Sequence, residues 1–296
     1  MTDRNWALAQ YRTSGGIATG IHVAGHVLTA PPVLGGLDVM QLLKDWDRWA
    51  EVLRTVDLDA LTPVVDAELV APLTYPNKVI CAGANYYDHA DEMGVDRPDP
   101  AVEPFFFLKT PTTTVVGPTA EVSIFDDGRS QVDWEAELGV VIGRKCVNVD
   151  PDDAADVIAG YLVANDVSDR GVFHRNGAVA PPFEWDWLGH KSQDGFCPLG
   201  PGLVPAWLVP DPQALKIRLD VNGIVKQDSN TSQMVVDVYR LIASASRVFT
   251  LEPGDVILTG TPAGVGMPRK DFLRPDDVVT IEIEGIGRIS NKVVAK

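Results

Sequence analysis

The fold is decided by a stretch near the middle of the chain, VDWEAELGVVI, which covers residues 132–142. Its apolar and β-branched residues predict a strand, and side chains alternate between the two faces of a strand. Asp133, Glu135 and Glu137 are therefore expected on one face. Two glutamates spaced in this way can share one hard cation, whereas unpaired like charges would repel each other. The alternative interpretation is a strand face exposed to water.

A second acidic element lies further along the chain, in GYLVANDVSDR at residues 160–170. The apolar part predicts a strand, and Asp166 at its end can supply a third oxygen ligand. Three carboxylates without cysteine or histidine suit Mg²⁺ or Mn²⁺ better than zinc. They also leave coordination positions open for water and substrate, which is typical of a catalytic metal site.

A histidine and a glutamate occur together in GANYYDHADEMG, residues 83–94. If this segment forms a helical turn, His89 and Glu92 are neighbours three positions apart. A carboxylate beside an imidazole orients the ring and raises its basicity, which is how a general base for activating water is commonly made. The alternative is an incidental pair on the surface.

Two further segments contain polar groups that suit such a site. LGHKSQDGFCPLGP, residues 188–201, contains Lys191, which near a metal could stabilise an enolate or oxyanion, although lysines exposed to water are commoner. LEPGDVILTGTPAGVG, residues 251–266, predicts a strand and then a glycine-rich loop whose backbone amides can hold a carboxylate. Neither GxGxxG nor GxxxxGK[ST] occurs in the sequence, which argues against dinucleotide binding and against a P-loop.

The pattern of elements predicts a β-rich α+β fold with two parts. Residues 1–70 read as a small N-terminal domain with a β segment at 11–28 and a helix at 39–56. The Pro-containing stretch APLTYP at 71–76 marks the boundary of a larger domain, residues 71–296. That domain is dominated by short strands, with isolated helical patterns at 151–158 and 234–248 and no regular βαβ alternation. Its predicted strands cover residues 78–82, 105–108, 134–142, 217–221, 256–259 and 278–283.

Composition excludes several classes of protein. The 296-residue chain has 41 acidic and 25 basic residues and a formal net charge of -16, which argues against nucleic acid or an anionic membrane as partner. No apolar run has the length of a signal peptide or a membrane span, so we expect a cytoplasmic protein. Its 3 cysteines show no CxxC spacing and its 5 histidines no HExxH pair, so neither a disulfide framework nor a zincin site is expected.

Taken together and in this order, the segments between residues 78 and 293 resemble the fumarylacetoacetate hydrolase family. The resemblance implies a mixed β-sandwich roll, a homodimer, and an Mg²⁺ or Mn²⁺ site. The implied metal ligands are Glu135, Glu137 and Asp166, and the implied catalytic residues are His89, Glu92 and Lys191. The residues implied to contact polar groups of the substrate are Lys109, Arg170 and Thr261.

The function that this resemblance implies is hydrolysis of a C–C bond in a small diketo acid, either an acylpyruvate or a fumarylacetoacetate-like compound. The metal would chelate the substrate, and water activated by His89 would attack the carbonyl. The alternative within the family is a decarboxylase or isomerase of a 2-oxo-dioate, in the catabolism of aromatic compounds. An alternative of another class is a catalytically silent oxo-acid binding protein, which would be expected to have lost a ligand or the base.

The sequence departs from the family pattern after Asp166. Ser168-Asp169-Arg170-Gly171 stands where Ser-Ala-Arg-Asp is frequent, and residues 172–187, rich in Phe, Trp and Pro, form an apparently longer stretch. Phe173 stands where some members have glutamine, and Gln193 and Gly195 stand where Phe and Thr are common. We expect residues 172–187 to set the shape of the substrate.

Overall fold

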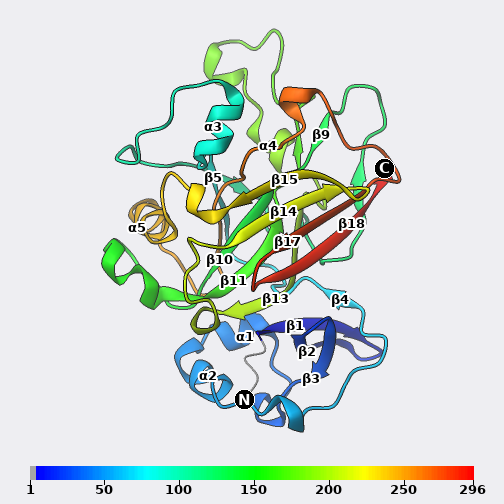
Figure 1. Cartoon of the computed structure of the whole chain (residues 1–296), viewed down its shortest axis with the longest axis vertical. Helices are drawn as coiled ribbons and strands as arrows, with labels where there is room; N and C mark the ends of the chain where they lie inside the picture. Colours follow the sequence, from blue (N-terminus) through cyan, green and yellow to red (C-terminus); the bar gives the residue numbers. More distant parts are fainter. Residues whose placement is uncertain (1–4) are drawn as a thin grey trace.

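A computed structural model describes residues 5–296, where five α-helices accompany three β-sheets (Figure 1). The helices are α1 (Val39–Leu43), α2 (Trp46–Leu53), α3 (Tyr87–Met93), α4 (Trp187–Lys191) and α5 (Val238–Val248). The predominance of strands confirms the predicted β-rich α+β class. No helix of the described chain is both long enough and apolar enough to cross a membrane.

The largest sheet has eleven strands and runs from the N-terminal segment into the body of the molecule. Its order is β3 (His26–Thr29), β2 (Gly16–Val23), β1 (Trp6–Thr13), β13 (Cys197–Pro205), β11 (Ile158–Asn165), β10 (Ala136–Ile142), β16 (Val256–Leu258), β5 (Val79–Gly83) and β6 (Phe105–Lys109). Two short strands lie off this path: β4 (Leu69–Val70) pairs with β1, and β7 (Val115–Val116) pairs with β13.

Part of this sheet rolls up, because the segment that follows its edge strand β6 pairs with β13. After β6 the chain continues for five residues into β7, which pairs in parallel with β13, so that Cys197 lies opposite Val115. The six strands from β13 to β6 therefore enclose an interior. One face of β10 and β11 lines it with apolar side chains such as Val141 and Leu162. Leu8 and Trp46 of the N-terminal segment belong to the same buried cluster.

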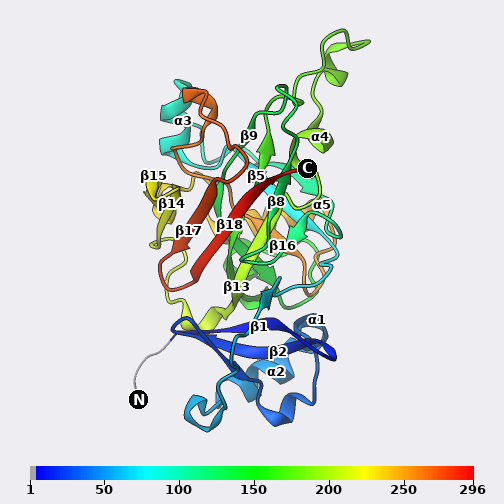
Figure 2. The ribbon, with the colours of Figure 1, turned by 90° about the vertical axis from the view of Figure 1, so that its right-hand side faces the viewer.

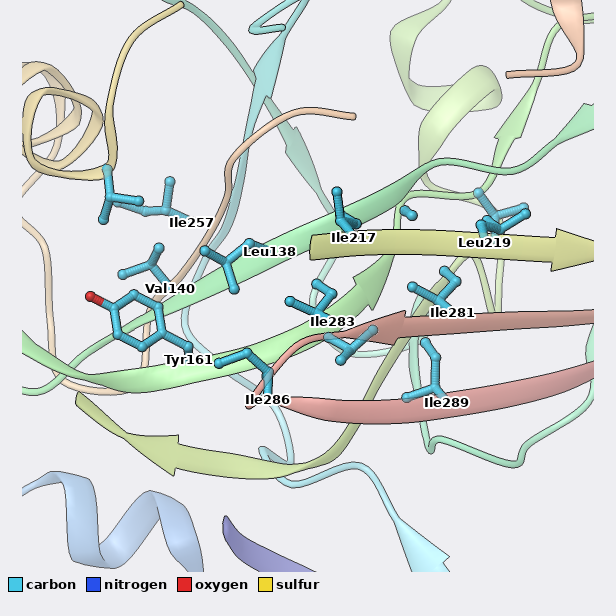
Figure 3. Packing of buried hydrophobic residues seen from close by; sticks show 14 of the residues in the cluster. Leu138, Val140, Tyr161, Ile217, Leu219, Ile257, Ile281, Ile283, Ile286 and Ile289 are labelled. Carbon is cyan, nitrogen blue, oxygen red and sulfur yellow. The ribbon is translucent and has the colours of Figure 1, made fainter. Parts of the chain in front are cut away.

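The outer face of the roll packs against a five-stranded sheet. That sheet has the order β15 (Ile224–Asn230), β14 (Lys216–Val221), β17 (Val278–Ile283), β18 (Gly287–Ala295) and β8 (Val122–Ile124). Figure 3 shows Leu138, Val140 and Tyr161 of the roll facing the isoleucines of β14, β17 and β18. A third sheet consists only of β9 (Val132–Asp133) and β12 (Ser168–Asp169). Packing of one sheet on another buries the apolar face of each.

The N-terminal segment lies at one end of the molecule (Figure 1) and is joined to the roll through β1 and β13, where Leu8 lies opposite Leu203. The division into residues 1–70 and 71–296 stays a prediction. The single helix predicted at 39–56 is wrong, because Asp45 leaves the helical region and separates α1 from α2. The buried positions keep their spacing of three and four residues across this break, so the periodicity alone did not reveal it.

Gly160 provides a test of how tightly the roll is packed. A Cβ atom at this position would lie 2.1 Å from the Val204 backbone oxygen on β13. We expect Gly160→Ala to lower the free energy of unfolding by about 1–3 kcal/mol, the usual cost of overpacking. Urea unfolding measures the change. Gly15→Ala is the control, since the nearest atom to its Cβ would be 3.9 Å away. Equal stability of the two variants would contradict the described pairing of β11 with β13.

Candidate active site

The glutamates of the central stretch lie at a break in the strand. β9 ends at Asp133 and β10 begins at Ala136, so Trp134 and Glu135 lie between them. The Asp133 carboxylate accepts hydrogen bonds from the amides of Trp134, Gly266 and Met267, at 2.8, 2.6 and 3.0 Å. Asp133 thus binds backbone amides of the loop after β16, besides the ion pair that it forms with Arg170. The side chains still alternate, because Trp134 and Ala136 enter the outer core while Glu135 and Glu137 face the other way.

Three carboxylates converge at this end of the roll. One oxygen each of Glu135, Glu137 and Asp166 lies within 4.8 Å of the others. The backbone holds the two strand ends together, since the Asp166 amide donates to the Glu135 carbonyl oxygen at 2.9 Å. The exposed fractions of the three residues are 7%, 1% and 0%, which excludes the alternative of a strand face exposed to water.

Three cations surround these carboxylates. Lys191 Nζ lies 2.8 Å from Glu135 Oε2 and 2.7 Å from Asp166 Oδ2. Lys109 Nζ lies 2.6 Å from Asp166 Oδ1. Arg170 bridges two acids, with Nη2 2.6 Å from Glu135 Oε1 and Nε 3.1 Å from Asp133 Oδ2. The structure thus brings Lys109, Lys191 and Arg170 to the carboxylates, and Arg170 is held by both of its partners.

Glu137 differs from its neighbours because no cation of the described residues pairs with it. Its partner is the Gly260 amide, which donates to Oε2 at 2.6 Å. Burial, together with the charges of Asp166 and Glu135, raises the pKa of Glu137 well above its usual value. Burial also disfavours the charged form of Glu135, but Lys191 and Arg170 outweigh it and lower the pKa of Glu135 to about 2. A divalent cation would relieve the conflict at Glu137, so the three oxygen donors fit Mg²⁺ or Mn²⁺.

The predicted histidine–glutamate pair lies on α3. The helix ends at Gly94, whose φ of +69° suits glycine. His89 Nδ1 lies 3.3 Å from Glu92 Oε2, as expected for neighbours three positions apart in a helix. One loop contacts both this pair and the carboxylate cluster, because the Gly264 amide donates to Glu92 at 3.0 Å and the Gly260 amide to Glu137 at 2.6 Å.

The glycine-rich loop after β16 binds the protein's own carboxylates. Besides the Gly260 amide on Glu137, the Ala263 amide donates to Asp88 at 3.3 Å, and the Gly264 amide to Glu92 at 3.1 and 3.0 Å. These amides were expected to hold a carboxylate, and the carboxylates that they bind belong to Asp88, Glu92 and Glu137 of the same chain.

Thr261 lies in the same loop, and its hydroxyl oxygen accepts a hydrogen bond from Gln227 Nε2 at 2.9 Å. A contact of Thr261 with substrate stays a prediction.

Aromatic side chains adjoin Lys191 on one side. The Phe107 ring centroid lies 5.0 Å from Lys191 Nζ and 5.0 Å from the Trp187 ring. Trp187 in turn contacts Phe173, with centroids 4.8 Å apart. Residues 172–187, which contain Phe173, extend away from the rest of the chain beyond α4 (Figure 2). Phe107 was not predicted as a site residue, although its position two residues before Lys109 places both side chains on one face of β6.

His190 was also not predicted as a site residue, and it contacts Arg170. Its Nδ1 lies 2.9 Å from the Asp169 carbonyl oxygen, and its Nε2 lies 3.4 Å from Arg170 Nη1. Burial, and then the charges of Lys191 and Arg170, lower the pKa of His190 to about 3. Its position next to Lys191 in the sequence is the one signal that could have identified it.

The neutral state of His190 makes stability depend on pH. In the unfolded chain a histidine takes up a proton below about pH 6.5, whereas folded His190 stays neutral down to about pH 3. The unfolded state thus binds one more proton in this window, and the free energy of unfolding falls as the pH drops. We expect His190→Gln to reduce this slope by up to about 1.4 kcal/mol per pH unit, measured by urea unfolding between about pH 4 and 6.

The control for this prediction is His174→Gln, because the His174 side chain is 49% exposed. We expect this variant to lose less of the slope than His190→Gln. If the free energy of unfolding of His190→Gln depends on pH as steeply as that of the unchanged chain and of the control, His190 is not neutral and buried.

The fold and the site can now be compared with known proteins. A family model described as fumarylacetoacetate (FAA) hydrolase C-terminal matches residues 78–294. A mitochondrial oxaloacetate tautomerase of Xenopus laevis is 48% identical over 229 residues, which cover 76% of this chain and 68% of that protein. A mitochondrial oxaloacetate tautomerase of Homo sapiens is 45% identical over 260 residues, or 86% of this chain and 79% of that protein.

Solved structures agree with the family model. A fumarylacetoacetate hydrolase from Exiguobacterium antarcticum has a TM-score of 0.84 and 34% identity, and the match covers 98% of this chain and 100% of the other. A maleylpyruvate hydrolase from Sphingobium sp. SYK-6, in complex with manganese(II) and pyruvate, has a TM-score of 0.77 and 31% identity over 98% of this chain and 99% of the other. The rolled β fold expected from the sequence is thereby confirmed.

Proposed function

The chain belongs to the fumarylacetoacetate hydrolase family, and we propose that it interconverts the keto and enol forms of a small 2-oxo-dicarboxylate of the oxaloacetate type. The observation that carries this proposal is the buried cluster of three carboxylate oxygens beside Lys191. The names of relatives that are 48% and 45% identical to this chain support oxaloacetate as the compound to test first.

The proposed cofactor is Mg²⁺ or Mn²⁺, held by Glu135, Glu137 and Asp166. Three oxygen donors with no sulfur or nitrogen suit a hard cation, and manganese in the related maleylpyruvate hydrolase supports the same choice. When bound, the cation supplies Lewis acidity toward the oxygens of the substrate. Which of the two metals the protein uses is part of the proposal to be tested.

The chain's own residues then move the proton. His89 Nδ1 lies 3.3 Å from Glu92 Oε2. With its proton on Nδ1, the ring donates to this oxygen, and the lone pair of Nε2 takes a proton from the carbon next to the 2-oxo group. The C–H bond breaks, its electron pair forms the C=C bond, and the carbonyl oxygen gains negative charge. The Lys191 ammonium is the charge that stabilises this oxygen. Water protonates this oxygen to give the enol, the hydroxide so formed takes the proton from His89 Nε2, and the reverse steps restore the keto form.

Hydrolytic C–C cleavage is the second candidate, and the His89–Glu92 pair favours it. The same base would take its proton from water instead of carbon, and the water oxygen would attack a carbonyl of a diketo acid. The C–C bond next to that carbonyl would break, and the leaving carbon would depart as an enolate that takes up the proton held by His89. The similar structures named as hydrolases support this candidate. Three expectations stay predictions: decarboxylation of a 2-oxo-dioate in aromatic catabolism, a homodimer, and a cytoplasmic location. The two tautomerase relatives are named as mitochondrial.

A substrate panel tests the proposed function. The enol form of oxaloacetate, acylpyruvates and fumarylacetoacetate are each incubated with the protein and Mg²⁺ or Mn²⁺, and products are followed by absorbance and NMR. We expect faster keto–enol exchange of oxaloacetate, lost on adding a chelator. C–C cleavage products without faster exchange would select hydrolysis, and release of carbon dioxide would select decarboxylation. Binding of the oxo-acids without any turnover would select the binding protein.

Glu137→Gln tests the proposed metal ligands. The amide keeps the shape of the side chain but supplies a weaker, uncharged donor, so we expect Mn²⁺ affinity and turnover each to fall more than about 100-fold. Calorimetric titration with Mn²⁺ and the oxaloacetate assay measure the two effects. Glu51→Gln, an exposed change on α2, is the matched control and should change neither. Unchanged Mn²⁺ affinity in Glu137→Gln would reject the proposed site.

A further inference from the structure

We propose that Arg269 is a positioning residue for the His89–Glu92 pair. This inference rests on the proposed function in one respect, namely that His89 acts as a base. Arg269 Nη1 lies 2.9 Å from Glu92 Oε1, while His89 Nδ1 lies 3.3 Å from Glu92 Oε2. The Glu92 carboxylate therefore contacts Arg269 with one oxygen and the His89 imidazole with the other.

The Glu92 carboxylate is bound by one amide of the glycine-rich loop. The Gly264 amide donates to both of its oxygens, and a Cβ at Gly264, where φ is +109°, would lie 2.1 Å from the Lys226 backbone oxygen. Because both Glu92 oxygens share the single Gly264 amide, this amide does not prevent the carboxylate plane from rotating about the hydrogen-bond axis. The guanidinium on Oε1 removes this freedom and directs Oε2 at His89.

Arg269 is in turn tied to the strand that bears the carboxylate cluster. It ends a short 3-10 helix, Met267–Arg269, and its Nη2 donates to the Val265 carbonyl oxygen at 2.5 Å. The Gly266 and Met267 amides donate to Asp133, which lies two residues before Glu135. The path from Asp133 through Arg269 to Glu92 thus sets the position of the base on α3 relative to the carboxylates.

The chemical consequence concerns which nitrogen of His89 carries the proton. With Oε2 held against Nδ1, the ring keeps its proton on Nδ1 and presents an unprotonated Nε2 to the substrate. If the carboxylate rotates away, nothing in the pair selects this tautomer. Arg269 therefore acts on the reaction through Glu92 and His89, without contact to the substrate.

A second arginine that pairs with an acidic residue of α3 offers a matched control. Arg97 forms an ion pair with Asp91 of α3, at 2.7 Å, and its guanidinium lies 5.5 Å from the Tyr87 ring centroid. Both arginines therefore tether α3 through an acidic side chain. Arg97 makes no contact with Glu92 or His89 among the described interactions, so Arg97→Ala loosens α3 and leaves the pair intact.

The test compares Arg269→Ala, Arg269→Lys and Arg97→Ala with the unchanged chain, using oxaloacetate and saturating Mn²⁺. We expect Arg269→Ala to lower kcat roughly tenfold with KM changed less than about twofold, because orientation of the base is lost while binding is kept. Arg269→Lys should restore part of kcat, since the lysine charge can still pair with Glu92. Arg97→Ala should stay near the unchanged chain.

A spectroscopic measurement makes the test independent of turnover. The ¹⁵N signals of the His89 ring, assigned with His89→Gln, report which nitrogen is protonated. We expect one tautomer, with the proton on Nδ1, in the unchanged chain and Arg97→Ala, and a mixture in Arg269→Ala. If the unchanged chain does not act on any substrate but this difference is seen, the proposed function fails and the positioning role stands. The same tautomer in all proteins, or equal losses in Arg269→Ala and Arg97→Ala, would overturn the inference.

Discussion

The structure depends on one electrostatic constraint: four buried carboxylates at one end of a rolled sheet must each be compensated. Burial of an unpaired charge is costly, so each acid needs a cation or several donors. The roll meets this need by bringing together groups from distant parts of the chain. Lys109 comes from the end of β6, Lys191 from α4, and Arg170 from the residue after β12. Glu137 alone is left to a backbone amide among the described residues, and this is where a divalent cation fits the charge balance.

The glycine-rich loop after β16 is the second structural support of the site. Its amides bind carboxylates from β9, from β10 and from α3, so a single loop fixes three separate elements relative to one another. Gly264 is required there because its positive φ and the nearby Lys226 oxygen leave no room for a side chain. In this arrangement the loop binds both the carboxylate cluster and the histidine–glutamate pair, through Glu137 and Glu92.

A cluster of oxygens, a lysine and an oriented imidazole can serve more than one reaction. Removal of a proton next to a carbonyl and activation of water need the same base, and both build negative charge on an oxygen. The choice of reaction therefore depends on which group the site places next to His89. The aromatic side chains of Phe107, Phe173 and Trp187 adjoin Lys191 on the side from which residues 172–187 extend (Figure 2).

The sequence by itself determined the β-rich class, the strand with Glu135 and Glu137 on one face, the acid at the end of the next strand, and the helical pairing of His89 with Glu92. These follow from local periodicity and spacing, which fix the face on which a side chain lies. Only the tertiary structure decided which partner each group has. Arg170 binds Asp133 and Glu135, Asp133 binds amides more than a hundred residues away, and Arg269 reaches Glu92 across 177 positions. Such partners are set by how the sheet rolls and where its loops return, and local spacing carries no information about that.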